Sequence, residues 1–193
     1  MKLRPKRAVT LVAALAMGFS TLIAGGTAQA ASASNYAHSN ATSGHRHAFD
    51  VSFQVRQLFS SSINASNVAD ADSSHCTGCH SVAIAFQIIA DGKVPSSVNA
   101  SNYGSAVNVD CVNCQTVGVA YQFIMAKPTV LSWSDQLKLW HIDGQLWSLY
   151  WSNASADQIA GQVNYLAGQV ESILANAGHG YWPLVHHFVT LRH

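Results

Sequence analysis

Hydrophobic residues alternate with polar or small residues in three short segments of the chain. In residues 51–55 the pattern Val-Ser-Phe-Gln-Val places large apolar side chains at every second position, and residues 84–88 and 119–123 repeat the aromatic-Gln pattern. Such alternation is typical of β-strands, although residues 82–89 would also fit one face of a helix. We expect strands, because short runs of β-branched and aromatic residues are bounded here by turn residues such as Asp91-Gly92.

A different periodicity, of three and four residues, runs through the C-terminal third. It places large residues at Trp133, Leu137, Trp140, Trp147 and Trp151, with Gly144 in phase, and at Ile159, Val163, Leu166, Val170 and Ile173. Ser155 with Gln158 three residues later forms a capping box, and Gly178 is a helix stop signal. The pattern predicts an antiparallel helical hairpin over residues 131–177 with coiled-coil-like spacing.

The tryptophans of the first helix share one face. They can form a platform for a ligand or pack in the protein core. We expect them to be buried, because aromatic side chains dominate the energetics of protein cores.

The central part of the chain contains an internal repeat with a period of 35 residues. Residues 63–89 and 98–124 align without a gap and share 11 of 27 positions, including two cysteines in each copy. Residues 51–55 echo the aromatic-Gln end of both copies, which indicates a third, fainter copy upstream. Similarity at a fixed period predicts that each copy is one supersecondary unit packed against its neighbour.

The first thirty residues have the composition of a secretory signal peptide. Four basic residues precede an apolar run at 8–24, and Ala28-Gln29-Ala30 is a small-residue cleavage site. We therefore predict that residues 1–30 are removed on export and that the protein is secreted or held in the cell envelope. Residues 31–48 are mostly Ser, Ala, Asn and His, and we interpret them as a flexible leader because they offer little apolar surface to bury.

Charge and hydropathy argue against two classes of protein. Without the four basic residues of the signal peptide, the chain has six Lys and Arg against nine Asp and Glu, a net charge of −3. Because it has no basic patch, we do not expect it to bind nucleic acid. No apolar run after Ala30 reaches the length of a membrane span, so we expect no transmembrane segment in the mature chain.

Two Cys-x-x-Cys pairs are the main chemical candidates: Cys76, Cys79, Cys111 and Cys114. An even number of cysteines in an exported chain usually forms disulfides, and we prefer this interpretation, with bridges either within each copy or between the copies. The alternative is a closed tetrathiolate zinc site, because each pair supplies two thiolates at the spacing that tetrahedral zinc needs.

Two further chemistries involve one pair alone. Cys76-Thr77-Gly78-Cys79-His80 matches the attachment motif of haem c, with His80 as proximal ligand and Met125 or a C-terminal histidine as distal ligand. Because Gln115 stands in place of His80 in the second copy, haem explains only two of the four cysteines. A dithiol redox centre is also less favoured, since no thioredoxin-like pattern surrounds either pair.

The remaining candidates for metal binding are histidines near the C-terminus: His179, His186, His187 and His193. We interpret residues 178–193 as a solvated His-rich tail, because chain termini are usually poorly ordered. The sequence contains no His-Glu-x-x-His, no Gly-x-Ser-x-Gly and no Gly-rich phosphate motif, so it identifies no catalytic residue.

The doubled Cys-x-x-Cys with its aromatic-Gln ends resembles a group of secreted, largely uncharacterised actinobacterial proteins. The matching stretches are residues 76–87, 111–122 and 131–174. Some members of this group carry the label of peptide zinc metalloproteases. This chain lacks the His-Glu-x-x-His motif and a membrane-embedded region, so the resemblance implies no activity here.

Together these patterns predict an α+β protein, in which a small cysteine-containing repeat unit with short strands packs on an antiparallel C-terminal helical hairpin. The repeat unit is expected over residues 49–128. We expect an exported, non-catalytic structural or interaction protein stabilised by the four cysteines, with an extracellular or cell-surface partner and no cofactor. The alternative is an exported protein that binds zinc or haem c through the same cysteines.

Overall fold

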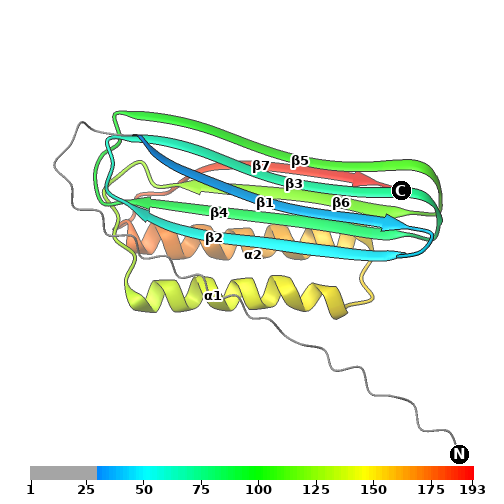
Figure 1. The fold of residues 1–193 in the computed structure, drawn as a ribbon. Coiled ribbons are helices and arrows are strands. Elements are labelled where there is room, and N and C mark those ends of the chain that lie inside the picture. The colour runs from blue at the N-terminus through cyan, green and yellow to red at the C-terminus, as the bar shows by residue number, and fades with distance from the viewer. Residues whose placement is uncertain (1–29) are drawn as a thin grey trace, which may run out of the picture.

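The computed structural model describes residues 30–193 and arranges them in three layers (Figure 1). Two β-sheets face each other, and two helices cover the outer face of one sheet. The strands are β1 (Ala31–Thr42), β2 (His47–Leu58), β3 (Ser62–Thr77), β4 (His80–Asp91), β5 (Ser97–Val112), β6 (Gln115–Ile124) and β7 (Leu184–Arg192). The helices are α1 (Trp133–Ser148), the short 3-10 helix η1 (Leu149–Trp151) and α2 (Ala156–Ala177).

Consecutive strands of the repeat region belong to different sheets, so each repeat folds as an arch. β1, β3 and β5 form a parallel sheet, called sheet A, while β2, β4 and β6 form the parallel part of sheet B. The arches stack on one another as three rungs. The register reproduces the sequence repeat, since Cys76 pairs with Cys111 and Gln87 with Gln122. Gln54 pairs with Gln87, so residues 51–55 take the same place in the first rung as residues 84–88 do in the second, and all three aromatic-Gln segments are strands.

Small and polar side chains fill most of the space between the two sheets, and Ile63, Ile89 and Ile124 fill it near one end of the strands. Alanines of both sheets cluster there, and amide side chains stack at the same height in successive rungs. Asn35 Nδ2 donates to Asn67 Oδ1 at 2.8 Å, and Asn67 Nδ2 donates to Asn102 Oδ1 at 2.8 Å. A second ladder of hydrogen bonds joins Gln54, Gln87 and Gln122. Because each rung carries the same amide at the same height, the buried amides hydrogen-bond to one another.

Large apolar side chains lie on the other face of sheet B, against the helices. β4 and β6 are buried almost throughout, since one face meets sheet A and the other meets the helical layer. Phe86, Phe123 and Met125 are fully buried in this second core, together with Leu139 and Leu174 of the helices. The hydrophobic contribution to stability is therefore concentrated between sheet B and the helices.

The two helices occur where the sequence signals predict them. Ser132 and Ser155 each form a capping box, with Asp135 and Gln158 respectively, and Gly178 is the C-cap of α2. Within residues 30–193, no helix combines the length and the apolar character that crossing a membrane requires.

The prediction that the tryptophans of the first helix are buried is wrong. Trp140 is 69% exposed and Trp151 is 82% exposed. Leu139, Ile142 and Leu146 lie on another face of α1 and fill the core instead. A helix that lies on a sheet buries only one face, and in α1 that face is the aliphatic one.

The predicted fold class is wrong. Strands make up 54% of the described residues and helices 25%, and the long strands form two sheets of three and four strands. The sequence analysis expected a small repeat unit with short strands on a helical hairpin. The helices instead form an accessory layer on a larger β-structure.

The predicted flexible leader, residues 31–48, contains β1 and the start of β2. In β1, buried side chains such as Ala33, Ala37 and Ala41 alternate with exposed polar ones. The interior between the sheets accepts only small residues at these positions, so β1 needs no large apolar side chain to be ordered. The predicted signal peptide falls almost entirely outside the described residues.

The predicted His-rich tail forms β7, which closes one end of the stack. β7 pairs antiparallel with β6 and also contacts β5 in the other sheet. Thr190 Oγ1 donates to Gly104 O at 3.0 Å, and Arg192 Nε donates to Ala106 O at 3.4 Å. These side chains bind carbonyl groups of an edge strand, which accounts for an ordered C-terminus.

Candidate four-cysteine site

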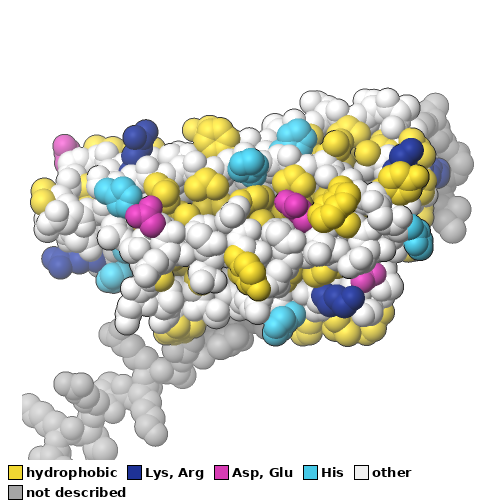
Figure 2. Space-filling view, turned by 180° about the vertical axis from the view of Figure 1, so that it is seen from behind, with side chains coloured by type: hydrophobic (Ala, Val, Ile, Leu, Met, Phe, Trp, Pro, Cys, Tyr) yellow, Lys and Arg dark blue, Asp and Glu magenta, His cyan; other side chains and the backbone are white. Residues whose placement is uncertain are grey.

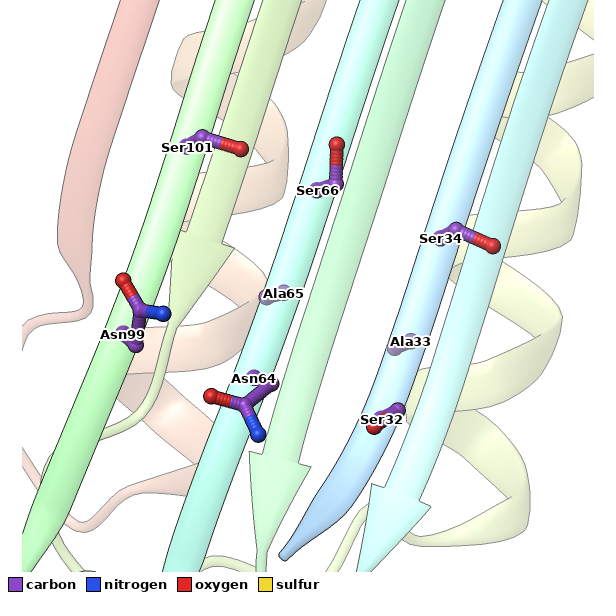
Figure 3. A pocket seen from close by; sticks show the side chains of 8 residues that line it. All are labelled: Ser32, Ala33, Ser34, Asn64, Ala65, Ser66, Asn99 and Ser101. Atoms are coloured by element: carbon purple, nitrogen blue, oxygen red, sulfur yellow. The ribbon is translucent and has the colours of Figure 1, made fainter.

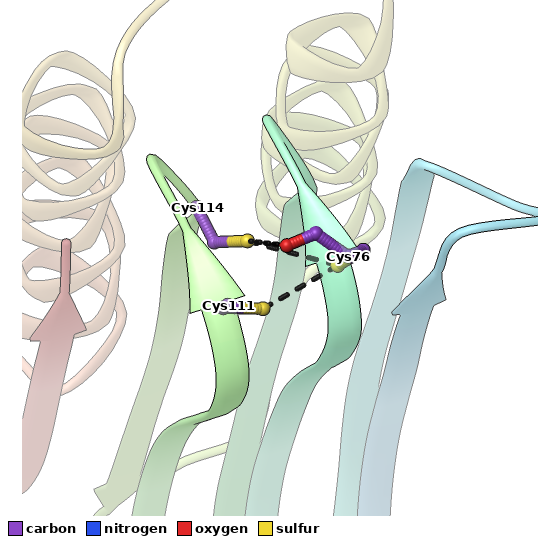
Figure 4. Close-up of side chains that lie close together, drawn as sticks. All are labelled: Cys76, Cys111 and Cys114. Atoms are coloured by element: carbon purple, nitrogen blue, oxygen red, sulfur yellow. Dashed lines mark hydrogen bonds between the residues drawn. The ribbon is translucent and has the colours of Figure 1, made fainter.

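The four cysteines lie together at the turns of the second and third arches, where the chain passes from sheet A to sheet B. Cys76 and Cys111 lie near the ends of β3 and β5 and are direct neighbours in the register. Cys79 and Cys114 lie in the turns that lead to β4 and β6. The structure thus brings together the predicted cysteines of both repeat copies, three of which are drawn in Figure 4.

The same backbone conformation builds both turns. Gly78 and Asn113, which stand between the cysteines of each pair, have φ values of 66° and 55°. Gly and Asn are the residues that adopt this left-handed conformation most readily. Because the two turns are 35 residues apart, they stack in register, and both Cys79 and Cys114 are buried.

A disulfide joins Cys76 and Cys79 within the second arch. Cys111 and Cys114 are free thiols. Their sulfur atoms lie 3.4 and 3.6 Å from Cys76 Sγ (Figure 4). The bridge in the second arch therefore lies directly against the thiols of the third arch.

The surroundings of Cys111 favour the neutral form of its thiol. Burial raises the pKa of the Cys111 thiol, and the neighbouring Cys114 raises it further. The thiolate is the form that attacks disulfides, so a raised pKa lowers reactivity at neutral pH. At neutral pH the Cys111 thiol is therefore a weak nucleophile, and it must lose its proton before it can bind a metal ion.

Three of the cysteines can coordinate a metal ion. The Sγ atoms of Cys76, Cys111 and Cys114 all lie within 4.8 Å of one another. A zinc ion with Zn–S bonds of about 2.3 Å in tetrahedral geometry needs sulfur atoms about 3.8 Å apart, which the arrangement nearly provides. Coordination by Cys76 requires reduction of its bridge, and this also frees the Cys79 thiol.

The residues suggested for haem binding do not meet. Cys79 packs between the sheets, whereas His80 follows it in β4 and lies on the opposite face, with its ring 6.3 Å from that of His47. Met125 lies beside Ile89, since Met125 N donates to Ile89 O. Ile89 is nine residues after His80 in β4, so Met125 lies about 30 Å from His80 along the strand. One iron ion cannot bind both His80 and Met125.

His80 is nevertheless unusual. Burial, assisted by His47, lowers the pKa of His80. Its Nε2 is buried and has no hydrogen-bond partner within the described part of the chain. The lowered pKa favours the neutral form of this partly buried imidazole.

The C-terminal histidines are dispersed. His186 and His187 are adjacent in β7, so their side chains point to opposite faces, and the ring of His187 stacks on Tyr121. His193 Nε2 lies 3.9 Å from Asp157 Oδ1 on the surface. His179 lies in the turn after α2, with φ 53°. The structure gives these four histidines no common site.

Sequence reasoning missed a second cluster, on the outer face of sheet A. The ligand atoms of His38, Asp70 and Asp72 lie within 4.8 Å of one another. Burial raises the pKa of Asp72, with a further contribution from Asp70. Only the register, which pairs His38 with Asp70, brings these residues together.

The outer face of sheet A also carries a shallow hollow of about 370 Å³ (Figure 3). Corresponding segments of three rungs line it: Ser32, Ala33, Ser34, Asn64, Ala65, Ser66, Asn99 and Ser101. The repeated Asn-Ala-Ser segment thus forms a polar surface that continues across the strands.

Comparison with known proteins gives no match: no family model, no curated protein and no solved structure is significantly similar to this chain. The fold and the site together define a protein of stacked β-arches with a helical cover and a buried cysteine cluster at the turns.

Proposed function

We propose that the protein is an exported, non-catalytic structural or interaction protein in which the four cysteines stabilise the stacked arches. One observation carries this proposal: the cysteines of two rungs form a single buried cluster at the turns. A cross-link at this point fixes the turns that hold sheet A against sheet B.

The composition of the interior explains why cross-links are useful there. Near the cysteines the sheets are held together by small side chains such as Ala41 and Ala48. Burial of a methyl group contributes only about 0.8 kcal/mol, much less than a Leu or Phe side chain. A bridge within one turn, such as Cys76–Cys79, closes a loop of about four residues and contributes about 2 kcal/mol by the loop-entropy relation, mainly by fixing that turn.

The repeat suggests how the second pair is used. Cys111 and Cys114 occupy a turn of the same backbone conformation as Cys76 and Cys79. We expect a second disulfide within the third arch when the protein matures in an oxidising compartment.

The intact mass of the chain, purified from the medium of an exporting host without reductant, tests the proposal. Two disulfides lower the mass by about 4 Da relative to the all-thiol chain, and non-reducing peptide mapping assigns the partners. We expect Cys76–Cys79 and Cys111–Cys114. The same mass locates the N-terminus and so tests the signal peptide. Four free thiols in the exported chain would contradict the proposal.

A matched pair of variants tests the structural role. Cys111→Ser/Cys114→Ser should lower the denaturation midpoint of the oxidised protein. Ser74→Ala, on the outer face of β3, should leave it unchanged.

A second candidate function, zinc binding, is supported by the proximity of Cys76, Cys111 and Cys114. Titration of the reduced protein with Co²⁺ should then give a thiolate charge-transfer band that saturates at one ion per chain. Loss of the band in Cys79→Ser would identify Cys79 as the fourth ligand. An exported protein with stoichiometric zinc and four thiols would favour this function over the disulfides.

A further inference from the structure

An exposed aromatic stripe runs along α1 and continues into η1. It consists of Trp133, Leu137, Trp140, Gly144, Trp147 and Trp151. The four tryptophans are 67%, 69%, 44% and 82% exposed in chain order, and Leu137 is 43% exposed. In Figure 1, α1 lies at the margin of the molecule, separated from sheet A by sheet B, and Figure 2 shows the same margin from behind. Trp147 also packs on Phe49 of β2, with ring centroids 6.2 Å apart, and it is the least exposed of the four tryptophans; Trp133, Trp140 and Trp151 are mostly exposed.

The stripe is nearly the same when read in either direction. Around position 142, Trp133 mirrors Trp151, Leu137 mirrors Trp147, and Trp140 mirrors Gly144. Two antiparallel copies of α1 would therefore bring each Trp140 opposite Gly144 of the other copy. Space above Gly144 is open, since a Cβ atom placed there would have no neighbour within 4 Å. Helices pack closely when a large side chain of one helix fits into a space between side chains of the other, and Gly144 leaves such a space.

The exposed area is sufficient for a stable interface. With about 250 Å² for a fully exposed tryptophan, the four tryptophans present about 650 Å² per copy. Two copies that covered these side chains completely would bury about 1,300 Å², which reaches the lower end of the range of specific protein interfaces. Contiguous apolar patches of this size are uncommon on monomeric proteins.

The charge pattern favours a protein partner over a membrane surface. Ser134, His141 and Ser148 are the exposed neighbours that flank the stripe on one side. The helix contains one lysine, Lys138, which is bonded to Asp135. Interfacial membrane helices usually carry several Lys or Arg beside their apolar face.

We propose that the stripe on α1 and η1 is a homodimer interface, in which two copies pair their α1 helices antiparallel about a two-fold axis at the level of residue 142. Such an interface is isologous and closes at two copies, so no further copy can be added through the same surface. The proposal does not depend on how the cysteines are bonded.

The pairing of Trp140 with Gly144 gives a specific test. Sedimentation velocity of the full exported chain over about 1–100 µM measures the dimer. Trp140→Gly leaves a gap and Gly144→Trp places two tryptophans against each other. We expect each to weaken the dimer by roughly 100-fold, because a buried tryptophan at the centre of an interface is a typical hot spot.

The double variant Trp140→Gly/Gly144→Trp exchanges the knob and the gap, and it should restore the dimer. Trp182→Ala is the matched control, since Trp182 is 63% exposed but lies outside the stripe. It should leave the dimer intact. Circular dichroism of each variant verifies folding, and Trp140→Glu adds a charge at the same exposed site as a second disrupting variant.

Three results would overturn the proposal. The first is a wild-type chain that remains monomeric at about 100 µM. The second is a dimer that survives Trp140→Glu, because its interface must then lie elsewhere. The third is a double variant as weak as the single ones. Binding of the monomer to zwitterionic vesicles or to a polysaccharide, lost in Trp140→Glu, would assign the stripe to that ligand instead.

Discussion

Substitution of Asn67 tests whether the buried amide ladder stabilises the stack. Asn67 is fully buried in the middle rung. Its Nδ2 donates to Ala85 O at 3.1 Å, to Asn102 Oδ1 at 2.8 Å and to Tyr121 O at 3.0 Å. Its Oδ1 accepts from Asn35 Nδ2 at 2.8 Å. One side chain therefore joins three rungs and both sheets.

Asn67→Ala should destabilise the protein by about 3–5 kcal/mol. The two protons of Asn67 Nδ2 are shared among three acceptors, and Oδ1 accepts one further bond, so about three hydrogen bonds are lost, each worth about 1 kcal/mol net. The loss also removes a donor from Asn102 Oδ1, which is partly buried, and this costs up to about 1–3 kcal/mol more, offset in part by relaxation or entry of water. With a urea m-value of about 2 kcal/mol/M, the midpoint should fall by about 2 M.

Urea denaturation followed by circular dichroism measures the shift. Asn64→Ala is the matched control, because Asn64 lies in the same strand but on the exposed outer face. It should change stability by less than about 0.5 kcal/mol. Asn67→Asp keeps the shape but cannot donate, so it should be at least as destabilising at pH 7. Equal midpoints for Asn67→Ala and Asn64→Ala would refute the role given to the ladder.

Three further predictions concern single side chains. Burial lowers the pKa of His80 from its usual value of 6.5, so the folded protein binds fewer protons than the unfolded chain below that pH. The protein should therefore lose stability as the pH falls through 6.5. His80→Gln should make the melting temperature less dependent on pH between about pH 7 and 5. Burial raises the pKa of Asp143 to about 6, so the ionised carboxylate destabilises the folded protein and stability falls as the pH rises. Asp143→Asn should therefore stabilise the protein by about 1–2 kcal/mol at pH 8 and have little effect at pH 3.5. An equal gain at both pH values would contradict this. Gly118→Ala should destabilise the protein by about 3 kcal/mol or more, because the new Cβ atom would collide with the Ser105 backbone. Gly161→Ala in α2 should stabilise it by about 1 kcal/mol in the same denaturation assay, because the new Cβ atom meets no neighbour and alanine favours the helix.

Much of the repeat region could be predicted, because equivalent residues recur every 35 positions along the chain. The 35-residue period fixes the register that pairs Cys76 with Cys111 and Gln87 with Gln122. Alternation predicted the strands around Phe86 and Tyr121. The helix caps at Ser155 and Gly178 were also predicted, because capping depends on local hydrogen bonds.

Strands made of small residues escaped prediction. β1 has no large apolar side chain on its buried face, so its composition resembles that of a flexible segment. β1 is ordered because it pairs with β3, where Asn35 lies beside Asn67 and Ala37 beside Ala69. β7 was missed for a different reason: it has large apolar residues but was interpreted as a tail because it lies at the C-terminus, whereas it pairs with the edge of β6.

The exposed tryptophans show the limit of periodicity. The spacing of Trp133, Trp140 and Trp147 identified one face of a helix, but α1 has a second apolar face at Leu139, Ile142 and Leu146. Periodicity describes both faces and does not say which one meets the sheet. That choice is made by packing against sheet B.

The sequence by itself determined the repeat, its register, the helices and the grouping of four cysteines, because these depend on spacing along the chain and on local hydrogen bonds. Only the tertiary structure decided that successive strands enter different sheets, that Cys76 bonds to Cys79, and that the tryptophans face outward. These features depend on which surfaces meet across the stack, and contacts between distant segments are not encoded in any local pattern.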